Sequence, residues 1–393
     1  MLANGRPYLA IPGPSVMPDR VLNAMHRASP NIYTGQLHEV THSLIPDLKS
    51  LARTDGNCAI YIGNGHAAWE AALANILSRG DHVLVLATGR FGHGWADIAR
   101  GMGINAEVLD FGQQKDVDLE RVEAALAADT GHRFKAVLMV HVDTSTSVKN
   151  DVPGMREVLD QSGHPALLCV DCIASFACDR FEMDAWGVDV MVSACQKGLM
   201  TPPGLGLVYF NEKADSARET ADLATSYWDW RPRVDPEQYY QFFNGTAPTH
   251  HIYGLREALD MIAEEGLEAV WARHERLART IWAAFDAWGR EGQMALNIAD
   301  PNKRSHAVTS AYAGPGDGDR LREWCERVAG VTLGIGLGRE PADAYFRIGH
   351  MGHVNAHMVL GVLAVMDAGL KALEIPHGVG ALEAAAKVVA EAR

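Results

Sequence analysis

Two residues at the ends of apolar segments carry side chains that could do proton-transfer and covalent chemistry together. Lys197 follows the apolar run 188–194, and a lysine amine in apolar surroundings can lose its proton and attack an aldehyde. Asp171 ends the apolar run 166–171, and a carboxylate there can keep a heterocyclic nitrogen protonated, so that the ring withdraws electrons. The pair therefore predicts a cofactor-dependent site.

Each of these residues alone has an ordinary explanation. An aspartate at a strand end is often a turn former, and a lysine that follows a strand is usually solvated. However, Asp171 and Lys197 are 26 residues apart, about one strand-helix-strand step, so we expect both side chains at the same edge of a parallel sheet. The proline- and glycine-rich turn 201–206 should then lead the chain back into the next strand.

A third feature is the segment 63–66 (GNGH), which lies between an apolar run and a helical pattern. Free backbone amides at a helix N-terminus bind anions, and glycines allow the anion to approach closely. A dinucleotide-binding loop would need a third glycine where Ala68 stands, so the sequence disfavours a Rossmann dehydrogenase. The alternative for this segment is a glycine-rich turn without a ligand.

The elements that must position these residues alternate between two patterns. Between residues 59 and 210, apolar runs typical of buried strands alternate with segments whose apolar residues have helical spacing. Strands are expected at 59–63, 82–87, 136–142, 166–171, 188–194 and 206–210, and helices at 66–77, 91–102, 118–127 and 153–161. This repetition predicts an α/β fold with a mostly parallel central sheet flanked by helices, whose ligands lie at the carboxyl ends of the strands.

The C-terminal part of the chain has a pattern of its own. After Tyr227 the sequence is aromatic and irregular, and a helical pattern then runs over 252–288. Further strands are expected at 307–313, 331–335 and 345–348, and helices at 358–370 and 380–389. We therefore predict an N-terminal arm (1–15), a large domain (16–265) and a smaller C-terminal α/β domain (266–393).

Composition argues against several classes of protein. The 393 residues are 48% hydrophobic and 21% charged, as in a soluble globular protein. With 35 Lys and Arg against 49 Asp and Glu, the formal charge of −14 disfavours nucleic acid as a partner. No segment approaches the ~20 apolar residues of a membrane span. The first residues show no signal or transit pattern, so a cytoplasmic location is expected.

The six cysteines are expected to be reduced, buried thiols, because several lie within apolar runs of a long chain. Cys169 and Cys172 have the spacing of a zinc knuckle, but no second pair of matching spacing follows. No metal site is therefore predicted.

Ordered motifs along nearly the whole chain resemble those of one known family. They lie at 11–15 (IPGPS), 63–66 (GNGH), 88–92 (TGRFG), 143–146 (DTST), 170–171 (VD), 196–198 (QKG), 244–246 (NGT) and 346–352 (FRIGHMG). With them the sequence resembles the class V aminotransferases of PLP fold type I, specifically the alanine/serine–glyoxylate branch. The resemblance implies an enzyme that uses pyridoxal 5'-phosphate (PLP) to move an amino group from serine, alanine or aspartate to glyoxylate or pyruvate.

The resemblance also implies roles for single residues toward the cofactor. Lys197 would be the Schiff-base lysine, and Asp171 would pair with the pyridine nitrogen. The other matching positions are the ring-stacking Phe91, the phosphate ligands Gly65, His66 and Gln196, the hydroxyl residue Thr144 near the ring oxygen or phosphate, and Thr246. In the family pattern Thr246 reaches the phosphate of the neighbouring subunit, which implies an obligate homodimer with shared active sites.

Two positions match the substrate side of the family's site. Arg347 matches the arginine that binds the substrate α-carboxylate, a task suited to its planar two-point fork. Ser15 follows the glycine-proline turn that lines the substrate side. Arg339 could be a second substrate cation, but its spacing from Arg347 aligns imperfectly and favours a surface arginine.

The chain departs from the family pattern at two places. Phe243 replaces a tyrosine found in many glyoxylate enzymes, so one hydrogen bond to the phosphate should be missing. Ser147 replaces a common glycine, and the preceding motif 143–146 is similar to those of ureidoglycine–glyoxylate and pyridoxamine–pyruvate relatives. The amino donor therefore remains open.

Two other functions compete with an aminotransferase. A PLP lyase of the desulfurase type needs a catalytic cysteine on a mobile loop, whereas Cys325 lies in a helical pattern. A non-catalytic α/β ligand-binding protein would leave the pair Asp171 and Lys197 unexplained.

Overall fold

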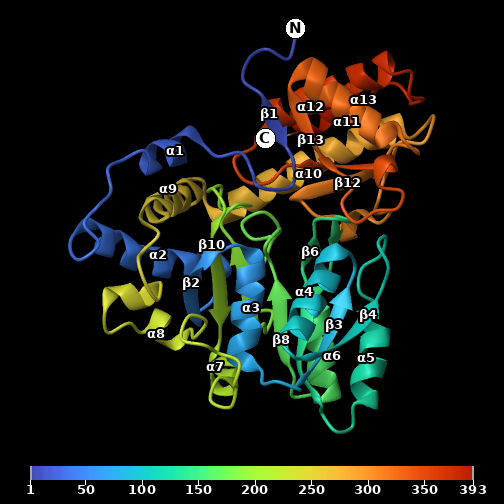
Figure 1. Cartoon of the computed structure of the whole chain (residues 1–393). Coiled ribbons are helices and arrows are strands. Elements are labelled where there is room, and N and C mark those ends of the chain that lie inside the picture. Colours follow the sequence, from blue (N-terminus) through green and yellow to red (C-terminus); the bar gives the residue numbers. More distant parts are fainter. Residues whose placement is uncertain (1, 392–393) are drawn as a thin grey trace.

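A seven-stranded sheet forms the centre of the larger part of the molecule. The computed structural model describes residues 2–391 and is drawn in Figure 1. The strands follow the order β2-β10-β9-β8-β5-β3-β4, and only β10 runs antiparallel to its neighbours. Their bounds are β2 (Asn57–Gly63), β3 (His82–Ala87), β4 (Asn105–Asp110), β5 (Phe134–Val140), β8 (Leu167–Asp171), β9 (Val190–Ala194) and β10 (Gly204–Phe210). The predicted fold class is thus confirmed.

Helices cover both faces of this sheet because its central strands are apolar on both sides. Along β3, Val83 and Val85 belong to one hydrophobic core, whereas Leu84 and Leu86 belong to another. Alternation of this kind is expected when a parallel strand is buried on two faces. The helices of this part are α2 (Gln36–Ala52), α3 (Gly65–Ile76), α4 (Arg90–Gly101), α5 (Leu119–Ala128), α6 (Val152–Ser162), α7 (Glu212–Ala217) and α8 (Arg231–Val234).

The helical pattern predicted over 252–288 forms two helices rather than one. They are α9 (Thr249–Glu265) and α10 (Leu267–Trp288), and the break falls at Gly266, whose φ of 84° is the left-handed conformation that glycine tolerates. The short helix α1 (Asp19–Met25) lies against α9.

A second sheet forms the C-terminal part and takes in a strand from the N-terminus (Figure 1). Its order is β1 (Tyr8–Ala10), β13 (Val331–Ile335), β14 (Tyr345–Gly349), β12 (Val308–Tyr312) and β11 (Ala295–Leu296). The helices of this part are α11 (Asp317–Ala329), α12 (Ala356–Ala372) and α13 (Ala381–Ala390). β1 runs parallel to β13, so the predicted arm joins the C-terminal sheet.

The division into an arm, a large and a small domain stays a prediction, and residue 1 and residues 392–393 of those ranges lie outside the described residues. Within residues 2–391, no helix has the length and apolar character needed to cross a membrane.

Several short elements lie between the longer ones. Strands β6 (Val142–Asp143) and β7 (Val148–Lys149) form a small antiparallel ribbon, and the 3-10 helices are η1 (Tyr239–Phe242), η2 (Pro301–Lys303) and η3 (Ala342–Ala344).

The helix expected between Asp171 and Lys197 is absent from the described chain, because residues 172–189 form turns. Buried Phe176 and Phe181 anchor these turns in the core, so the connection does not need a helix to cover the sheet.

Candidate active site

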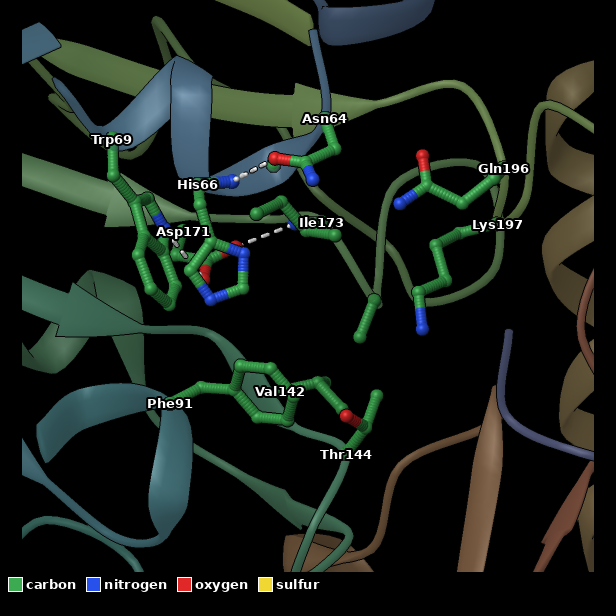
Figure 2. Close-up of a pocket in the computed structure, with 12 residues that line it drawn as sticks. Asn64, His66, Trp69, Phe91, Val142, Thr144, Asp171, Ile173, Gln196 and Lys197 are labelled. Carbon is green, nitrogen blue, oxygen red and sulfur yellow. Dashed lines mark hydrogen bonds between the residues drawn. The ribbon is translucent and has the colours of Figure 1, made fainter. Parts of the chain in front are cut away.

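A cavity of about 220 Å³ lies where β8 and β9 end and α3 begins (Figure 2). Every residue that the sequence predicted to bind a cofactor lines this cavity, with the exception of Thr246. Figure 2 shows Lys197 and Gln196 on one side of the space, Asp171 with Trp69 on the other, and Phe91 and Thr144 along a third wall. The carboxyl edge of the sheet thus gathers the reactive side chains.

Asp171 is the last residue of β8 and is only 3% exposed. Its Oδ1 accepts a hydrogen bond from the Ile173 amide (2.7 Å), and its Oδ2 accepts one from the indole Nε1 of Trp69 (3.0 Å). Burial raises the pKa of Asp171 to about 7, although both hydrogen bonds oppose the rise. A carboxylate has about four acceptor positions, so this one can still pair with a cationic ring nitrogen.

Lys197 lies just beyond β9, and its Nζ donates a hydrogen bond to the Pro12 carbonyl. Burial, followed by the nearby positive charge of Arg347, lowers the pKa of Lys197 to about 8. A side chain at Gly13 would overlap the lysine amine, so the glycine keeps the space in which the amine lies. The neutral, nucleophilic form of the amine is therefore much more populated near neutral pH than it is for a solvated lysine.

The N-terminal segment also holds the backbone beside this lysine. Ser15 Oγ donates to the Lys197 carbonyl (2.7 Å), and the Ser15 amide donates to the Gln196 carbonyl (2.9 Å). Ser15 was predicted to lie on the substrate side; its side chain bonds the backbone of the lysine loop and is not among the residues that line the cavity.

The N-terminus of α3 forms another part of the cavity wall. Asn64 caps the helix, and its side chain accepts from the amides of His66 (3.1 Å) and Ala67 (3.3 Å). Gly65 permits close contact with Ile173, because a side chain at residue 65 would overlap it. The His66 amide, expected to bind phosphate, is thus engaged by Asn64 in this structure.

The side-chain oxygen of Gln196 has no hydrogen-bond partner within the described residues. This atom, Oε1, is buried. A buried polar atom without a partner is costly, and this one lies at the cavity wall.

A buried acid holds the backbone at Phe91. Asp143 Oδ2 accepts from the Phe91 amide (2.9 Å) at the start of α4, and its Oδ1 accepts from the Ser145 amide (2.9 Å). Thr144 lies between Asp143 and Ser145 in the sequence, and its side chain faces the cavity. Ser147, which stands where relatives often have glycine, has a φ of 62°. This left-handed conformation explains why glycine suits the position.

Arg347 lies on β14 and is buried beside the cavity, although it does not line it. Its Nε donates to the Ile335 carbonyl (2.8 Å) and its Nη1 to the Thr144 carbonyl (3.0 Å). These bonds leave the Nη2 N–H groups and one Nη1 N–H group available for an anion.

The interpretation of Arg339 as a surface arginine is wrong. Its side chain is buried, with Nη2 donating to Asn297 Oδ1 (2.7 Å), Nη1 donating to the Gln113 carbonyl (3.1 Å) and the guanidinium 4.2 Å from the centre of the Tyr345 ring. Burial is tolerated because the planar group stacks on an aromatic ring and finds acceptors.

Thr246 lies apart from the cavity on the surface of the chain. It lines a separate hollow of about 430 Å³ together with the exposed Tyr33 and Tyr240. Phe243, close to it in sequence, is fully buried.

Sequence reasoning did not single out Trp69, Asn64, Ile173 or Asp143 as site residues. Trp69 occupies a core position of a helical pattern, and nothing in that pattern indicates that its N–H faces Asp171. Asn64 was the more accessible signal, because asparagine is a preferred N-cap before a helix.

The fold and the site define a class of protein. The profile of the family "Aminotransferase class-V" matches residues 7–336, and the chain belongs to this family. It is therefore an aminotransferase, as the sequence predicted, and the family and its fold imply a PLP-dependent enzyme.

Named relatives are similar over nearly the whole length. A serine–glyoxylate aminotransferase of Arabidopsis thaliana is 35% identical over 98% of this chain and 96% of its own. An L-aspartate–glyoxylate aminotransferase of Paracoccus denitrificans is 34% identical over 96% and 94%. The crystal structure of ureidoglycine–glyoxylate aminotransferase from Bacillus subtilis is 26% identical, covers 99% of this chain and 100% of its own, and has a TM-score of 0.89.

Proposed function

We propose that this aminotransferase binds PLP through Lys197 and transfers an amino group from serine, alanine or aspartate to glyoxylate or pyruvate. The observation that carries the proposal is that a buried amine with a lowered pKa and a buried carboxyl with a raised pKa face one cavity. The substrates are inferred from relatives named for serine, aspartate and glyoxylate.

The donor set of the cavity fits PLP. A buried carboxyl at Asp171 suits a cationic ring nitrogen, and a neutral amine at Lys197 suits an aldehyde. The side chain of Gln196 lines the cavity, and its Nε2 N–H groups could donate to a phosphate. Phe91 would lie against the ring, with Thr144 near the ring oxygen or phosphate.

PLP supplies an aldehyde that condenses with amines and a protonated ring that draws electrons from the substrate Cα. Asp171 would pair with the ring nitrogen and stabilise its positive charge. Lys197 would hold the cofactor through its amine, and as a free amine its Nζ would be the base and acid that moves a proton at the substrate Cα. Arg347 orients the substrate through its carboxylate, with the N–H groups that its backbone contacts leave available.

We further propose a homodimer in which Thr246 completes the phosphate site of the partner subunit. Support comes from its position in an exposed hollow with Tyr33 and Tyr240, away from the cavity of its own chain. We also propose a cytoplasmic location, in keeping with six buried, unpaired thiols.

A second donor class is supported by the solved ureidoglycine–glyoxylate aminotransferase. The cysteine expected for a desulfurase gains no such support, because Cys325 is buried within α11.

The proposal is tested by adding single amino acids to the PLP-loaded enzyme and following the loss of the visible absorption band of the lysine-bound cofactor. Serine, alanine, aspartate, ureidoglycine and pyridoxamine form the screen. Lys197→Ala should abolish turnover and still bind PLP, whereas Lys213→Ala, at a half-exposed lysine, should behave as wild type. Borohydride reduction should label Lys197, and a label on another lysine would refute the assignment.

A further inference from the structure

The acid proposed to hold the cofactor ring is itself held by a tryptophan. Trp69 lies on α3, is fully buried and donates from Nε1 to Asp171 Oδ2 across 3.0 Å (Figure 2). The other oxygen, Oδ1, is fixed by the Ile173 amide at 2.7 Å. Two neutral donors, the Trp69 indole on α3 and the Ile173 amide just after β8, therefore set the plane of the carboxylate. Neither donor carries a charge that would neutralise it.

This bond is not a general requirement for burying an indole here. Trp95 stacks on Trp69 with ring centres 5.8 Å apart and an interplanar angle of 13°, and it is buried just as fully. Nevertheless, the Trp95 Nε1 has no hydrogen-bond partner within the described chain. Of two neighbouring indoles in one core, only that of Trp69 is directed at the acid.

The groups around Asp171 act on it in opposite directions. Burial and the nearby Asp143 favour its neutral form, and the adjacent Cys172 is a buried thiol, whereas Lys197 favours its ionised form. A hydrogen bond from an indole favours the ionised form as well, because a carboxylate oxygen is a better acceptor than a carboxyl oxygen. His66 packs against the Trp69 ring (centres 4.6 Å apart).

We propose that Trp69 is a positioning residue for Asp171: its indole N–H orients the carboxylate and favours its ionised form, so that the proton shared with the cofactor's ring nitrogen resides on nitrogen. This inference rests on the proposed function. It also makes α3 responsible for two ends of the cofactor, because Gly65 begins the helix at the expected phosphate and Trp69 follows one turn later.

The test compares Trp69→Phe with Trp95→Phe. Both substitutions remove the same atoms from stacked rings, but only Trp69→Phe removes a hydrogen bond. The first readout is the ¹⁵N chemical shift of ring-labelled PLP bound to each protein. Trp69→Phe should move this shift toward that of an unprotonated pyridine, and Trp95→Phe should leave it as in wild type. Thermal melts of the cofactor-free variants report any difference in folding.

The second readout is the affinity for pyridoxamine 5'-phosphate, which has the ring but no aldehyde. Trp69→Phe should weaken it about tenfold, the factor that corresponds to 1.4 kcal/mol, with little change in Trp95→Phe. Should Trp69→Phe not fold, Trp69→His, which keeps a ring N–H, is compared with Trp69→Met, which has none, and the former should lie closer to wild type.

Equal ¹⁵N shifts and affinities in Trp69→Phe and Trp95→Phe, or in Trp69→His and Trp69→Met, would overturn the role of Trp69. Failure of the wild-type protein itself to bind PLP would instead overturn the proposed function, so the two failures are distinguishable.

Discussion

At the scale of single residues, burial does the same thing to two groups of opposite charge. It raises the pKa of Asp171 to about 7 and lowers that of Lys197 to about 8. In both cases the neutral form gains because a charge loses hydration in the protein interior. Proton exchange near neutral pH thus becomes accessible to a carboxyl and an amine that in water titrate several pH units apart.

The shift at Lys197 predicts how PLP enters the cofactor-free protein. Only the neutral amine attacks an aldehyde, so the rate of incorporation should rise with pH and level off above a midpoint near 8. Stopped-flow absorbance over a pH series gives the midpoint. Binding of pyridoxamine 5'-phosphate, which needs no such attack, serves as the control and should not increase through this range. A midpoint near 10.5, the value of a solvated lysine, would contradict the assignment.

Arg347→Lys should cost about 2–3 kcal/mol of transition-state binding for the amino donor and for the oxo acid alike. Lysine keeps the charge, but it cannot hold two backbone carbonyls and present a second pair of N–H groups to a carboxylate. Specificity constants for both substrates are measured beside thermal melts. Arg339→Lys is the matched control, expected to lower stability more than specificity; unchanged constants in a well-folded Arg347→Lys protein would remove Arg347 from the site.

The positions of Lys197 and Asp171 at one cavity followed from sequence because Asp171 ends one buried apolar strand and Lys197 follows shortly after another. Contacts between residues that are far apart in the sequence could not be predicted from it. The bond from Trp69 to Asp171 spans 102 residues and that from the Phe91 amide to Asp143 spans 52. Arg339 was misjudged for the same reason, since only the fold brings its acceptor Asn297 and the ring of Tyr345 together.

At the scale of elements, strands that are buried over most of their length were predicted with errors of a few residues. The expected strand 82–87 matches β3, and 166–171 contains β8. β4 was missed because its sequence, NAEVLD, is half-exposed and mixes polar with apolar residues at the sheet edge. β1 was missed because three residues carry too little periodicity, and its partner β13 is more than 300 residues away in sequence.

The short helix α8 carries a buried cation, Arg233, which forms no ion pair among residues 2–391. Arg233 donates to the carbonyls of Ile60 (3.0 Å), Phe242 (3.1 Å) and Tyr227 (2.6 Å), and burial lowers its pKa. It therefore ties β2 to the aromatic segment that precedes Thr246.

Arg233→Met should lower the free energy of unfolding by about 3–5 kcal/mol, because three buried carbonyls lose their donor. Denaturant titration measures the loss. Arg231→Met, on the same helix but in a half-exposed pair with Asp215, should cost less than about 1 kcal/mol. Equal losses in the two variants would show that the buried contacts of Arg233 contribute no more to the free energy of unfolding than the half-exposed pair of Arg231.

At the scale of the whole molecule, the hollow lined by Thr246 gives a testable prediction for the proposed homodimer. A glutamate in place of Tyr240, which is 55% exposed there, would bring a charge into the proposed dimer contact. We expect Tyr240→Glu to sediment as a monomer and to lose PLP affinity. Val379→Glu, at an apolar residue that is 80% exposed elsewhere, should remain dimeric and active. A wild-type monomer with full activity at micromolar concentration would contradict the shared site.

The pairing of β1 with β13 has a consequence for the protein while it is being made. Translation adds about 5–20 residues per second, so β13 leaves the ribosome roughly 6 to 24 s after β10, the last strand of the seven-stranded sheet. Until then the first strand has no neighbour to pair with, and the carbonyl of Pro12 is not anchored beside the amine of Lys197. A nascent chain can thus complete its central sheet while its lysine is still unpaired. A ribosome stalled before residue 331 should carry a chain that reacts with aldehydes differently from the released protein.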